Sequence, residues 1–374
     1  MQKSDKRHIK IVLTGGHAAT SALSVVEEFL RQSDNYFWEI FWIGAASAFE
    51  GHKVLPLEQR VLPRLGITSY KIVSGRVQRK WSRYTIPSVL KIPLGFFHAL
   101  FLLIKIRPRI ILSFGGFAAF PVVLGGYLLR IPVVIHEQTV AIGLANRVSS
   151  FFATKIAISR RESEKFFPSS KVKLIGLPLM SSIFEIFPKK NHGVPPTIYI
   201  TGGSRGAAKI NKVVDEILEQ LLKKYIIIHQ CGNLEYAYFL RRKRNLSPEL
   251  SRRYEVYDFI DPADVASVYR RADILISRAG AHTVAEIMAT ARPSVLIPIS
   301  WSRYDEQLQN ARLAQKSGLA VVITEDKLSP GILLQKIEEI LKNWTFMVSG
   351  SKNTYSKLDR LASGKLVELI KSCL

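Results

Sequence analysis

Short runs of apolar residues, each followed by glycine or a polar turn, recur along the whole chain. In the first half they occupy residues 9–13, 37–43, 110–112 and 132–136, and in the second half residues 197–201, 225–230, 254–260, 274–277, 294–299 and 319–323. Continuous apolar runs of this kind are typical of strands buried on both faces. Stretches with apolar residues at helical spacing follow several of them. This alternation predicts a parallel, doubly wound α/β sheet in each half.

The rhythm is interrupted once, near the middle of the chain. Residues 180–196 gather proline, glycine and lysine, which is typical of a linker. We therefore predict two Rossmann-like domains, at residues 1–183 and 184–352. Residues 353–374 form a further helical segment, with Leu358, Leu361, Ala362, Leu366 and Leu369 at core-facing spacing.

Two apolar stretches raise the question of a membrane span. Residues 92–104 are too short to cross a bilayer. Residues 110–129 are long enough, but they contain four glycines and Pro121. We therefore interpret residues 110–129 as a buried strand, a turn and a helix.

Glycine turns follow three of the predicted strands, at residues 14–17, 113–117 and 201–206. A strand, a glycine turn and a helix start can cradle a phosphate, because the backbone approaches the anion closely and the helix N–H groups point at it. In the third turn Ser204 adds a hydroxyl donor and Arg205 a charge. The alternative is that glycine serves only the backbone conformation of the turn.

Composition narrows the class of protein. The chain has 374 residues, 47% of them hydrophobic, as expected of a folded protein with room for two cores. Its net charge of +23 favours a nucleic acid, an anionic membrane or a phosphorylated substrate. Because zinc-ligand clusters and RNA-stacking motifs are absent from the sequence, we expect no nucleic-acid partner. The two cysteines, Cys231 and Cys373, lie far apart and suit a reducing compartment.

Residues 70–107, from Tyr70 to Arg107, mix cations with bulky apolar side chains such as Trp81, Phe96 and Phe97. This mixture suits a surface that enters the headgroup layer of an anionic membrane. The alternative is an amphipathic helix packed on the sheet, with lysines that extend to solvent.

Five stretches taken together resemble the MurG-type N-acetylglucosaminyltransferases, and their order along the chain is the family's order. They are residues 14–17, 113–117, 136–146, 201–207, and 277–286 together with 305–311. The resemblance implies the GT-B architecture, in which two Rossmann-like domains face a cleft and the C-terminal helix packs back on the first domain. It also implies transfer of GlcNAc from UDP-GlcNAc to the 4-OH of a lipid-linked muramyl-peptide, with inversion, at the cytoplasmic face of the bacterial membrane. No metal ion or cofactor is expected.

The resemblance assigns roles to individual residues. Glu286 matches the carboxylate that accepts hydrogen bonds from the ribose hydroxyls, and Gln307 matches the amide that binds the hydroxyls of the sugar. His17 is the candidate base or, equally, a binder of the diphosphate, and Glu137 is the alternative base. Ala281, His282 and Thr283 match the helix start whose backbone N–H groups hold the diphosphate, and Ile260 matches the position that flanks the uracil. The remaining donor-side positions are Ser204, Val284 and Ala285, and the remaining acceptor-side positions are Thr14, Gly15, Gly16, Thr139 and Met180.

The sequence departs from the family pattern mainly on the acceptor side. Thr20 replaces a proline, Thr139 an asparagine, Leu177 an asparagine and Met180 an arginine. A thioether cannot replace the fixed cation of arginine. Two alternatives therefore stay open: a related transferase with another lipid or metabolite acceptor, and a homologue that binds UDP-sugars without turnover.

Overall fold

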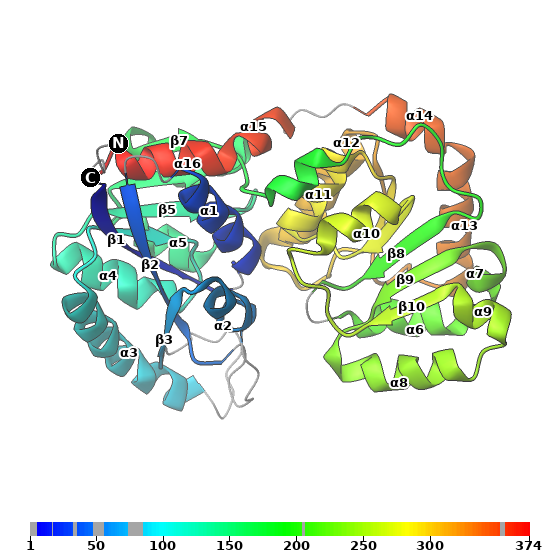
Figure 1. The fold of residues 1–374 in the computed structure, drawn as a ribbon, viewed down its shortest axis with the longest axis horizontal. Helices are drawn as coiled ribbons and strands as arrows, with labels where there is room; N and C mark the ends of the chain where they lie inside the picture. The colour runs from blue at the N-terminus through cyan, green and yellow to red at the C-terminus, as the bar shows by residue number, and fades with distance from the viewer. Residues whose placement is uncertain are drawn as a thin grey trace, which may run out of the picture. The chain divides into compact units, whose positions relative to one another are not determined.

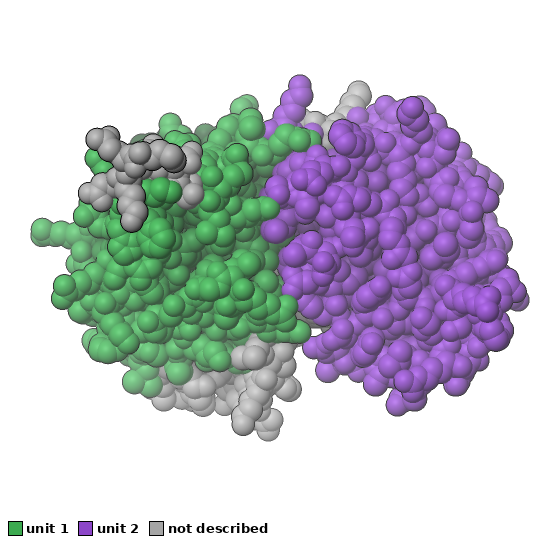
Figure 2. All heavy atoms as spheres, in the orientation of Figure 1, with its two compact units in different colours: residues 1–178, 358–374 green, residues 179–357 purple. Residues whose placement is uncertain are grey.

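The structure is a computed structural model of the chain. It describes residues 6–16, 18–32, 36–47, 56–73, 85–203, 206–351 and 356–374, and only the backbone of residues 85–91 and of Arg303. The chain divides into two compact units, which Figure 2 colours separately. The first consists of residues 1–178 and 358–374, and the second of residues 179–357.

A parallel sheet forms the centre of the first unit, with helices on its faces (Figure 1). Its described strands are seven, in the order β3-β2-β1-β4-β5-β6-β7. Their bounds are β1 Arg7–Gly15, β2 Tyr36–Ala45, β3 Thr68–Ile72, β4 Ile110–Ser113, β5 Val133–Glu137, β6 Lys155–Ile158 and β7 Val172–Leu174.

The second unit repeats this arrangement around another parallel sheet. The described part of it has six strands, in the order β10-β9-β8-β11-β12-β13. Their bounds are β8 Thr197–Thr201, β9 Ile226–Gln230, β10 Tyr254–Tyr257, β11 Ile274–Ser277, β12 Ser294–Leu296 and β13 Ala320–Val322. In both sheets the strand order reverses beside the first strand of the unit, between β1 and β4 and between β8 and β11. Ligands of doubly wound sheets bind outside the carboxyl ends of the strands at such a switch point.

Helices and short 3-10 turns connect the strands. The helices of the first unit are α1 Ala19–Arg31, α2 Leu57–Val61, α3 Thr85–Ile106, α4 Ala119–Leu128, α5 Leu144–Ser149, α15 Ser356–Arg360 (whose first residues belong to the second unit) and α16 Ala362–Lys371. Those of the second unit are α6 Ala208–Glu216, α7 Leu218–Lys224, α8 Asn233–Arg244, α9 Pro248–Arg252, α10 Val265–Arg271, α11 Ala281–Thr290, α12 Glu306–Lys316, α13 Pro330–Lys342 and α14 Trp344–Ser349. The 3-10 turns are η1 Leu62–Leu65, η2 Arg161–Phe166, η3 Ser169–Lys171, η4 Ser181–Glu185 and η5 Arg303–Asp305.

The predicted fold class of two Rossmann-like, doubly wound units is confirmed. Apolar strand residues such as Val12, Ile43 and Ile111 are fully buried, as the continuous apolar runs require. Residues 110–129 form β4, a turn and α4, so their interpretation as a buried unit is also confirmed. Within the described residues, no helix is both long and apolar enough to cross a membrane.

The C-terminal segment differs in detail from the single helix that the sequence predicts. It forms two helices, α15 and α16, which meet at Leu361. The second packs against α1 of the same unit, where Lys371 Nζ donates to Gln32 Oε1 at 2.7 Å. A hydrophobic period alone could not reveal this break, because the apolar positions on both sides of it keep the same spacing.

A buried ion pair fixes this C-terminal segment to the sheet of the first unit. The guanidinium of Arg160 contacts the carboxylate of Asp359 through two hydrogen bonds of 2.6 and 2.8 Å. The backbone N–H of Leu177 donates to the same carboxylate at 2.8 Å. Both side chains are almost fully buried. Asp359 therefore joins two segments that lie next to the points where the chain passes between the units.

We expect the substitution Asp359→Ala to destabilise the first unit strongly. It removes both bonds between the buried guanidinium of Arg160 and Asp359, and the breaking of a buried ion pair typically costs about 3–5 kcal/mol. Urea denaturation measures the free energy of unfolding. Glu368→Ala is the control, because it removes an ion pair with Lys371 whose carboxylate is mostly exposed. Equal stability of the two variants would contradict the anchoring role of Asp359.

Candidate active site

Two glycine turns meet at the switch point of the first sheet. Thr14, near the end of β1, pairs with Ser113 at the end of β4. The N–H of Gly16 donates to the carbonyl of Gly115 at 2.9 Å. A Cβ on Gly116, which has a φ of +90°, would lie 3.0 Å from the Gly16 nitrogen. The two turns thus pack directly on each other, and this contact requires glycine.

The predicted acceptor-side residues of this edge are Thr14, Gly15, Gly16 and His17. Thr14 is fully buried, and its hydroxyl has no hydrogen-bond partner among the described residues. Gly15 is the last residue of β1, and Gly16 follows it. His17 lies outside the described residues.

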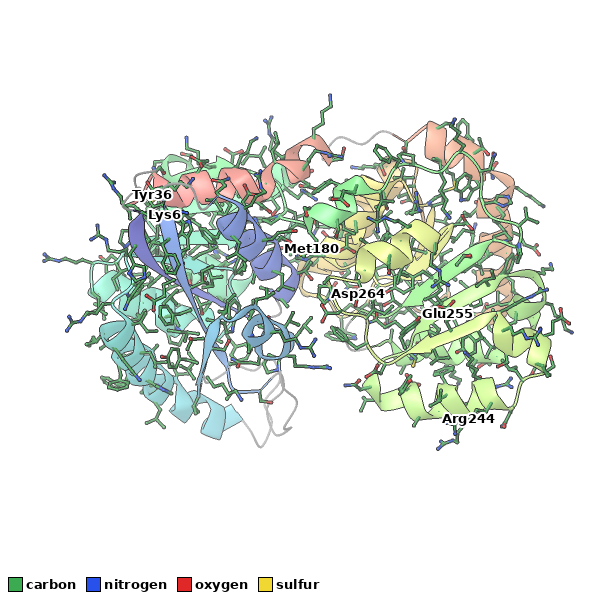
Figure 3. The ribbon with its side chains drawn as sticks, in the orientation of Figure 1. Lys6, Tyr36, Met180, Arg244, Glu255 and Asp264 are labelled. Atoms are coloured by element: carbon green, nitrogen blue, oxygen red, sulfur yellow. The ribbon has the colours of Figure 1, made fainter. Side chains whose placement is uncertain are left out.

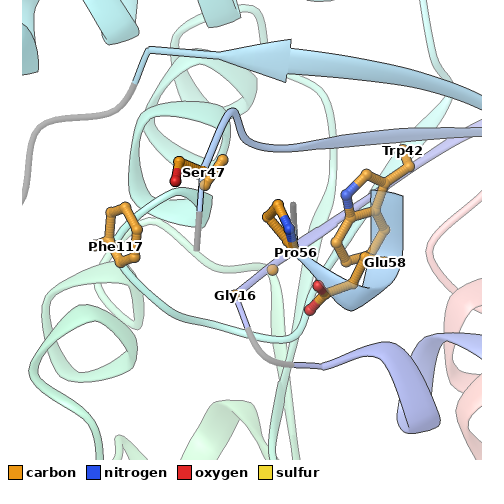
Figure 4. A pocket seen from close by; sticks show the side chains of 8 residues that line it. Gly16, Trp42, Ser47, Pro56, Glu58 and Phe117 are labelled. Atoms are coloured by element: carbon orange, nitrogen blue, oxygen red, sulfur yellow. The ribbon is translucent and has the colours of Figure 1, made fainter. Parts of the chain in front are cut away.

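A small pocket opens beside these turns (Figure 4). Gly16, Trp42, Pro56, Glu58 and Phe117 are among its lining residues. Glu58 is fully buried, and its Oε1 accepts a hydrogen bond of 2.6 Å from the N–H of Ala18, the residue before α1. A carboxylate at this position is stabilised by the positive end of the helix. The sequence did not reveal Glu58, because its partner lies 40 residues away.

Glu137, the alternative base, ends β5 and is buried. Its Oε1 accepts hydrogen bonds from the N–H of Thr139 at 3.1 Å and from the Thr139 hydroxyl at 2.9 Å. Its Oε2 accepts a bond of 2.8 Å from Asn146 Nδ2. Burial raises the pKa of Glu137, and the hydrogen bonds from Asn146 and Thr139 partly offset this effect. Three protein donors thus occupy three of the roughly four acceptor positions of the Glu137 carboxylate, which restricts its access to a substrate proton.

The same cluster extends to the second glycine turn. Gly115 has a φ of +80°, and a Cβ there would lie 2.4 Å from Asn146 Oδ1. Only glycine therefore fits beside the Asn146 side chain that Glu137 holds, and Asn146 Oδ1 itself is buried without a hydrogen-bond partner among the described residues. Thr139 takes part in this arrangement although the family normally has asparagine at its position.

Met180, the last predicted acceptor-side residue, stands immediately before η4 and is half-buried; Figure 3 labels it. Leu177, which also departs from the family pattern, is fully buried. The Leu177 side chain is thus part of the packing of the first unit.

The third glycine turn follows β8 at the switch point of the second sheet. The N–H of Gly203 donates to Thr201 Oγ1 at 2.9 Å, and the carbonyl of Gly203 accepts a bond of 3.2 Å from Gln230 Nε2. Gly206 has a φ of +72°, and a Cβ there would lie only 2.1 Å from the carbonyl oxygen of Cys231. Glycine is therefore required at position 206. Ser204 lies outside the described residues.

Helix α11 begins at the neighbouring strand end, after β11. Gly280 precedes it in an extended conformation, and no side chain of the described residues caps it. The predicted diphosphate-binding residues Ala281, His282 and Thr283 form its first turn, where a helix presents backbone N–H groups and a positive dipole. Val284 and Ala285 are buried and pack the helix on its own unit.

Glu286 lies one turn further along α11 and is 9% exposed. Its Oε2 accepts a hydrogen bond of 2.9 Å from the hydroxyl of Tyr269, which is on α10. Burial raises the pKa of Glu286 to about 7, against the lowering effect of the bond from Tyr269. The sequence placed Glu286 on this helix but gave no sign of Tyr269, whose contact depends on how α10 and α11 pack.

Two further predicted residues, Ile260 and Gln307, complete the donor side. Ile260 is buried and lies beyond the end of β10, which stops at Tyr257, before the predicted strand end. Gln307 is the second residue of α12, and its Oε1 accepts a bond of 3.2 Å from the N–H of Ile299. Its amide nitrogen has no hydrogen-bond partner among the residues that the structure describes.

We expect the affinity for a nucleotide held by Glu286 to fall as the pH drops below about 7. Hydroxyl groups donate to the carboxylate form, so protonation of Glu286 competes with the ligand. The groups that face it, Tyr269 and Tyr199, stay neutral because burial raises the pKa of both phenols. Well below this pH, the affinity should fall by about tenfold per pH unit, which corresponds to about 1.4 kcal/mol of binding free energy.

Calorimetric titration with UDP-GlcNAc between pH 5.5 and 8.5 measures this dependence. The variant Glu286→Gln is the control, because it cannot ionise. An affinity of the unaltered protein that is independent of pH would contradict a direct contact between the ligand and the Glu286 carboxylate.

Residues 14–158 match the glycosyltransferase family 28 N-terminal domain, and residues 197–364 match the family 28 C-terminal domain. A Bacillus cereus protein named UDP-N-acetylglucosamine–N-acetylmuramyl-(pentapeptide) pyrophosphoryl-undecaprenol N-acetylglucosamine transferase 2 is 32% identical, over 89% of this chain and 92% of its own. A Clostridium kluyveri protein with the same enzyme name is 31% identical, over 97% of this chain and 99% of its own.

Among solved structures, the chain is similar to Acinetobacter baumannii MurG. The TM-score is 0.65 and the sequence identity is 24%, over 98% of this chain and 99% of that one. This likeness concerns the fold, and it agrees with the predicted GT-B class.

Proposed function

Because the chain belongs to the family of UDP-N-acetylglucosamine–N-acetylmuramyl-(pentapeptide) pyrophosphoryl-undecaprenol N-acetylglucosamine transferases, we propose that it performs their reaction. It is a glycosyltransferase that uses UDP-GlcNAc and acts in peptidoglycan synthesis. It transfers GlcNAc to lipid-linked N-acetylmuramyl-peptide and so converts lipid I into lipid II. The observation that carries this conclusion is the match to relatives of one activity over most of the chain and in both units.

For the donor, we propose a site at the carboxyl edge of the second sheet. The Glu286 carboxylate accepts hydrogen bonds from the two ribose hydroxyls. The first turn of α11, at Ala281, His282 and Thr283, binds the diphosphate through backbone N–H groups. Ile260 flanks the uracil, and Ser204 donates to a phosphate. Gln307 donates from its amide nitrogen to the sugar hydroxyls, since its oxygen already accepts the Ile299 N–H.

For the chemical step, we propose direct displacement with inversion. The O4 of the muramyl sugar forms a bond to C1 of GlcNAc while the bond between C1 and the UDP oxygen breaks. The O4 proton passes to a base, His17 or Glu137. The charge that develops on UDP is stabilised by the positive end of α11. Glu137 already accepts hydrogen bonds from Thr139 and Asn146, which favours His17.

The sequence departs from the family pattern mainly on the acceptor side, where Thr139 and Met180 replace the usual asparagine and arginine. An assay of UDP release therefore uses UDP-GlcNAc with a short-chain lipid I analogue. The expected result is release that depends on lipid I. Release only with another lipid or metabolite would indicate a related transferase, and binding of UDP-GlcNAc without release for any acceptor would indicate a non-catalytic homologue.

We further propose that the protein binds peripherally to the anionic cytoplasmic face of the membrane through residues 70–107. Of these, residues 74–84 lie outside the described residues, as do the side chains of residues 85–91. On α3, four large apolar side chains share one face and are more than half exposed: Leu94, Phe97, Phe101 and Ile104. Lys105, Arg107 and Arg109 follow them and are also exposed. Phe96, by contrast, is half-buried.

The double substitution Phe97→Ser with Phe101→Ser should reduce binding to anionic vesicles by more than about tenfold, because each phenylalanine contributes roughly 1.5–3 kcal/mol when buried. Flotation with vesicles measures binding, and it should also weaken at high salt. Phe346→Ser is the control, since Phe346 lies in the second unit and is 78% exposed. Unchanged flotation of the double variant would exclude this face of α3.

A further inference from the structure

A single buried carboxylate connects three segments at the carboxyl edge of the second sheet. Glu325 follows β13 by three residues, and its side chain is 4% exposed. Its Oε1 lies 2.6 Å from a guanidinium nitrogen of Arg278. Its Oε2 lies 3.3 Å from Lys209 Nζ and accepts hydrogen bonds from the Ser300 hydroxyl, at 2.9 Å, and the Ser300 N–H, at 3.4 Å.

The three partners of Glu325 come from the three segments that carry the proposed donor site. Lys209 is in the first turn of α6, directly after the third glycine turn. Arg278 follows β11 and precedes α11, the helix of Glu286. Ser300 is in the loop between β12 and α12, which leads to Gln307. Segments that are far apart in sequence thus share one anchor.

The contact with Ser300 reaches Gln307 in one further step. Ser300 is held at both its N–H and its hydroxyl, and the N–H of the preceding Ile299 donates to Gln307 Oε1 at 3.2 Å. Arg278 also donates to the carbonyl of Ile297 at 3.1 Å, just before the same loop. The position of the Gln307 amide therefore depends on a backbone that Glu325 holds from one side and Arg278 from the other.

Glu325 is suited to this role because it stays ionised. Burial raises its pKa, but the hydrogen bonds from Ser300 and Arg278 outweigh burial and lower the pKa to about 2. Hydrogen bonds to an ionised acceptor are stronger and more directional than neutral ones.

We propose that Glu325 is a positioning residue that sets the selectivity for the hexosamine of the nucleotide donor, by fixing the loop at residues 299–307. This inference rests on the proposed function, because it takes the donor to be UDP-GlcNAc. Glu325 itself does not touch the sugar in this account. It acts through Ser300, Ile299 and Gln307.

The test compares kcat and KM for UDP-GlcNAc with those for its C4 epimer, UDP-GalNAc, in the full chain. The variant Glu325→Gln keeps the shape of the side chain but removes its charge. It should raise KM for UDP-GlcNAc by about tenfold or more, as the loss of bonds to a charged group predicts, and change kcat less. The preference for UDP-GlcNAc over its epimer should fall, and the affinity for UDP, which lacks the sugar, should change less than the affinity for UDP-GlcNAc.

Two further variants separate positioning from stability. Ser300→Ala removes one bond at an exposed residue, so it should fold normally and show a smaller loss of selectivity in the same direction. Glu338→Gln breaks an ion pair with Lys224 in which both side chains are about half exposed, and should leave KM and selectivity unchanged.

The outcomes decide whether Glu325 positions Gln307 or only stabilises the fold. The inference is overturned if Glu325→Gln and Ser300→Ala leave the selectivity unchanged, or if Glu325→Gln lowers the affinities for UDP and UDP-GlcNAc equally. Glu325 would then have only a structural role. If Glu325→Gln does not fold, Ser300→Ala decides alone. Failure of the unaltered protein to bind UDP-GlcNAc would instead remove the proposed function, and the inference with it.

Discussion

Replacement of His17 by alanine should lower kcat by about 10²–10⁴-fold, which is the usual contribution of general acid–base catalysis. An imidazole side chain is suited to this role, because histidine can exchange a proton at physiological pH. The affinity for UDP-GlcNAc should change little, because the proposed donor contacts lie in the second unit. Steady-state kinetics with a lipid I analogue and calorimetric titration with UDP-GlcNAc measure the two quantities.

His8→Ala is a matched control for His17→Ala. His8 is the second residue of β1, and its side chain is 53% exposed. A large rise in the dissociation constant for UDP-GlcNAc, with kcat unchanged, would make His17 a binder of the diphosphate. If His17→Ala keeps a kcat close to that of the unaltered protein, and Glu137→Gln loses the acid limb of the pH profile of kcat, the base is Glu137.

Replacement of Glu286 by alanine should weaken binding of UDP by about a hundredfold or more, because two hydrogen bonds to a charged acceptor are lost at roughly 1.5–3 kcal/mol each. Calorimetric titration with UDP measures the loss. The effect on kcat at saturating donor should be smaller, since the ribose is remote from the reacting carbon.

Glu286→Gln distinguishes a binding role from a structural one. Glutamine keeps an acceptor for the Tyr269 hydroxyl, which Glu286 normally binds at 2.9 Å, but it lacks the charge. It should therefore be as stable as the unaltered protein and still bind UDP more weakly. Glu249→Ala, at a side chain that is 76% exposed, serves as a neutral control. Equal UDP affinity of Glu286→Ala and the unaltered protein would remove the assignment of this residue.

In the first sheet, the sequence predicted the central strands better than those toward the edges. Strands such as β1 and β8 were predicted because their apolar runs end at glycine turns. The strands β3, β6 and β7 were not, because they are short and carry lysine at Lys71, Lys155 and Lys173. A strand of this kind is stabilised by its neighbours in the sheet, which a local pattern does not contain.

The residues of the candidate site were likewise predicted only in part. Glu286 and Gln307 were predicted from motifs that are contiguous in sequence. Glu58, Tyr269 and Glu325 were not predicted, because each acts through a partner that only the fold brings near: the N–H of Ala18, the carboxylate of Glu286, and the groups of Arg278 and Ser300. The raised pKa of Glu286 follows from burial and likewise has no signature in the sequence.

The most direct test of the central claim is the crystal structure of the protein with UDP-GlcNAc bound. We predict that both ribose hydroxyls donate to Glu286, that the diphosphate lies against the first turn of α11, and that the amide of Gln307 contacts the sugar. A nucleotide bound away from the carboxyl edge of the second sheet, or a ribose that does not contact Glu286, would contradict the account.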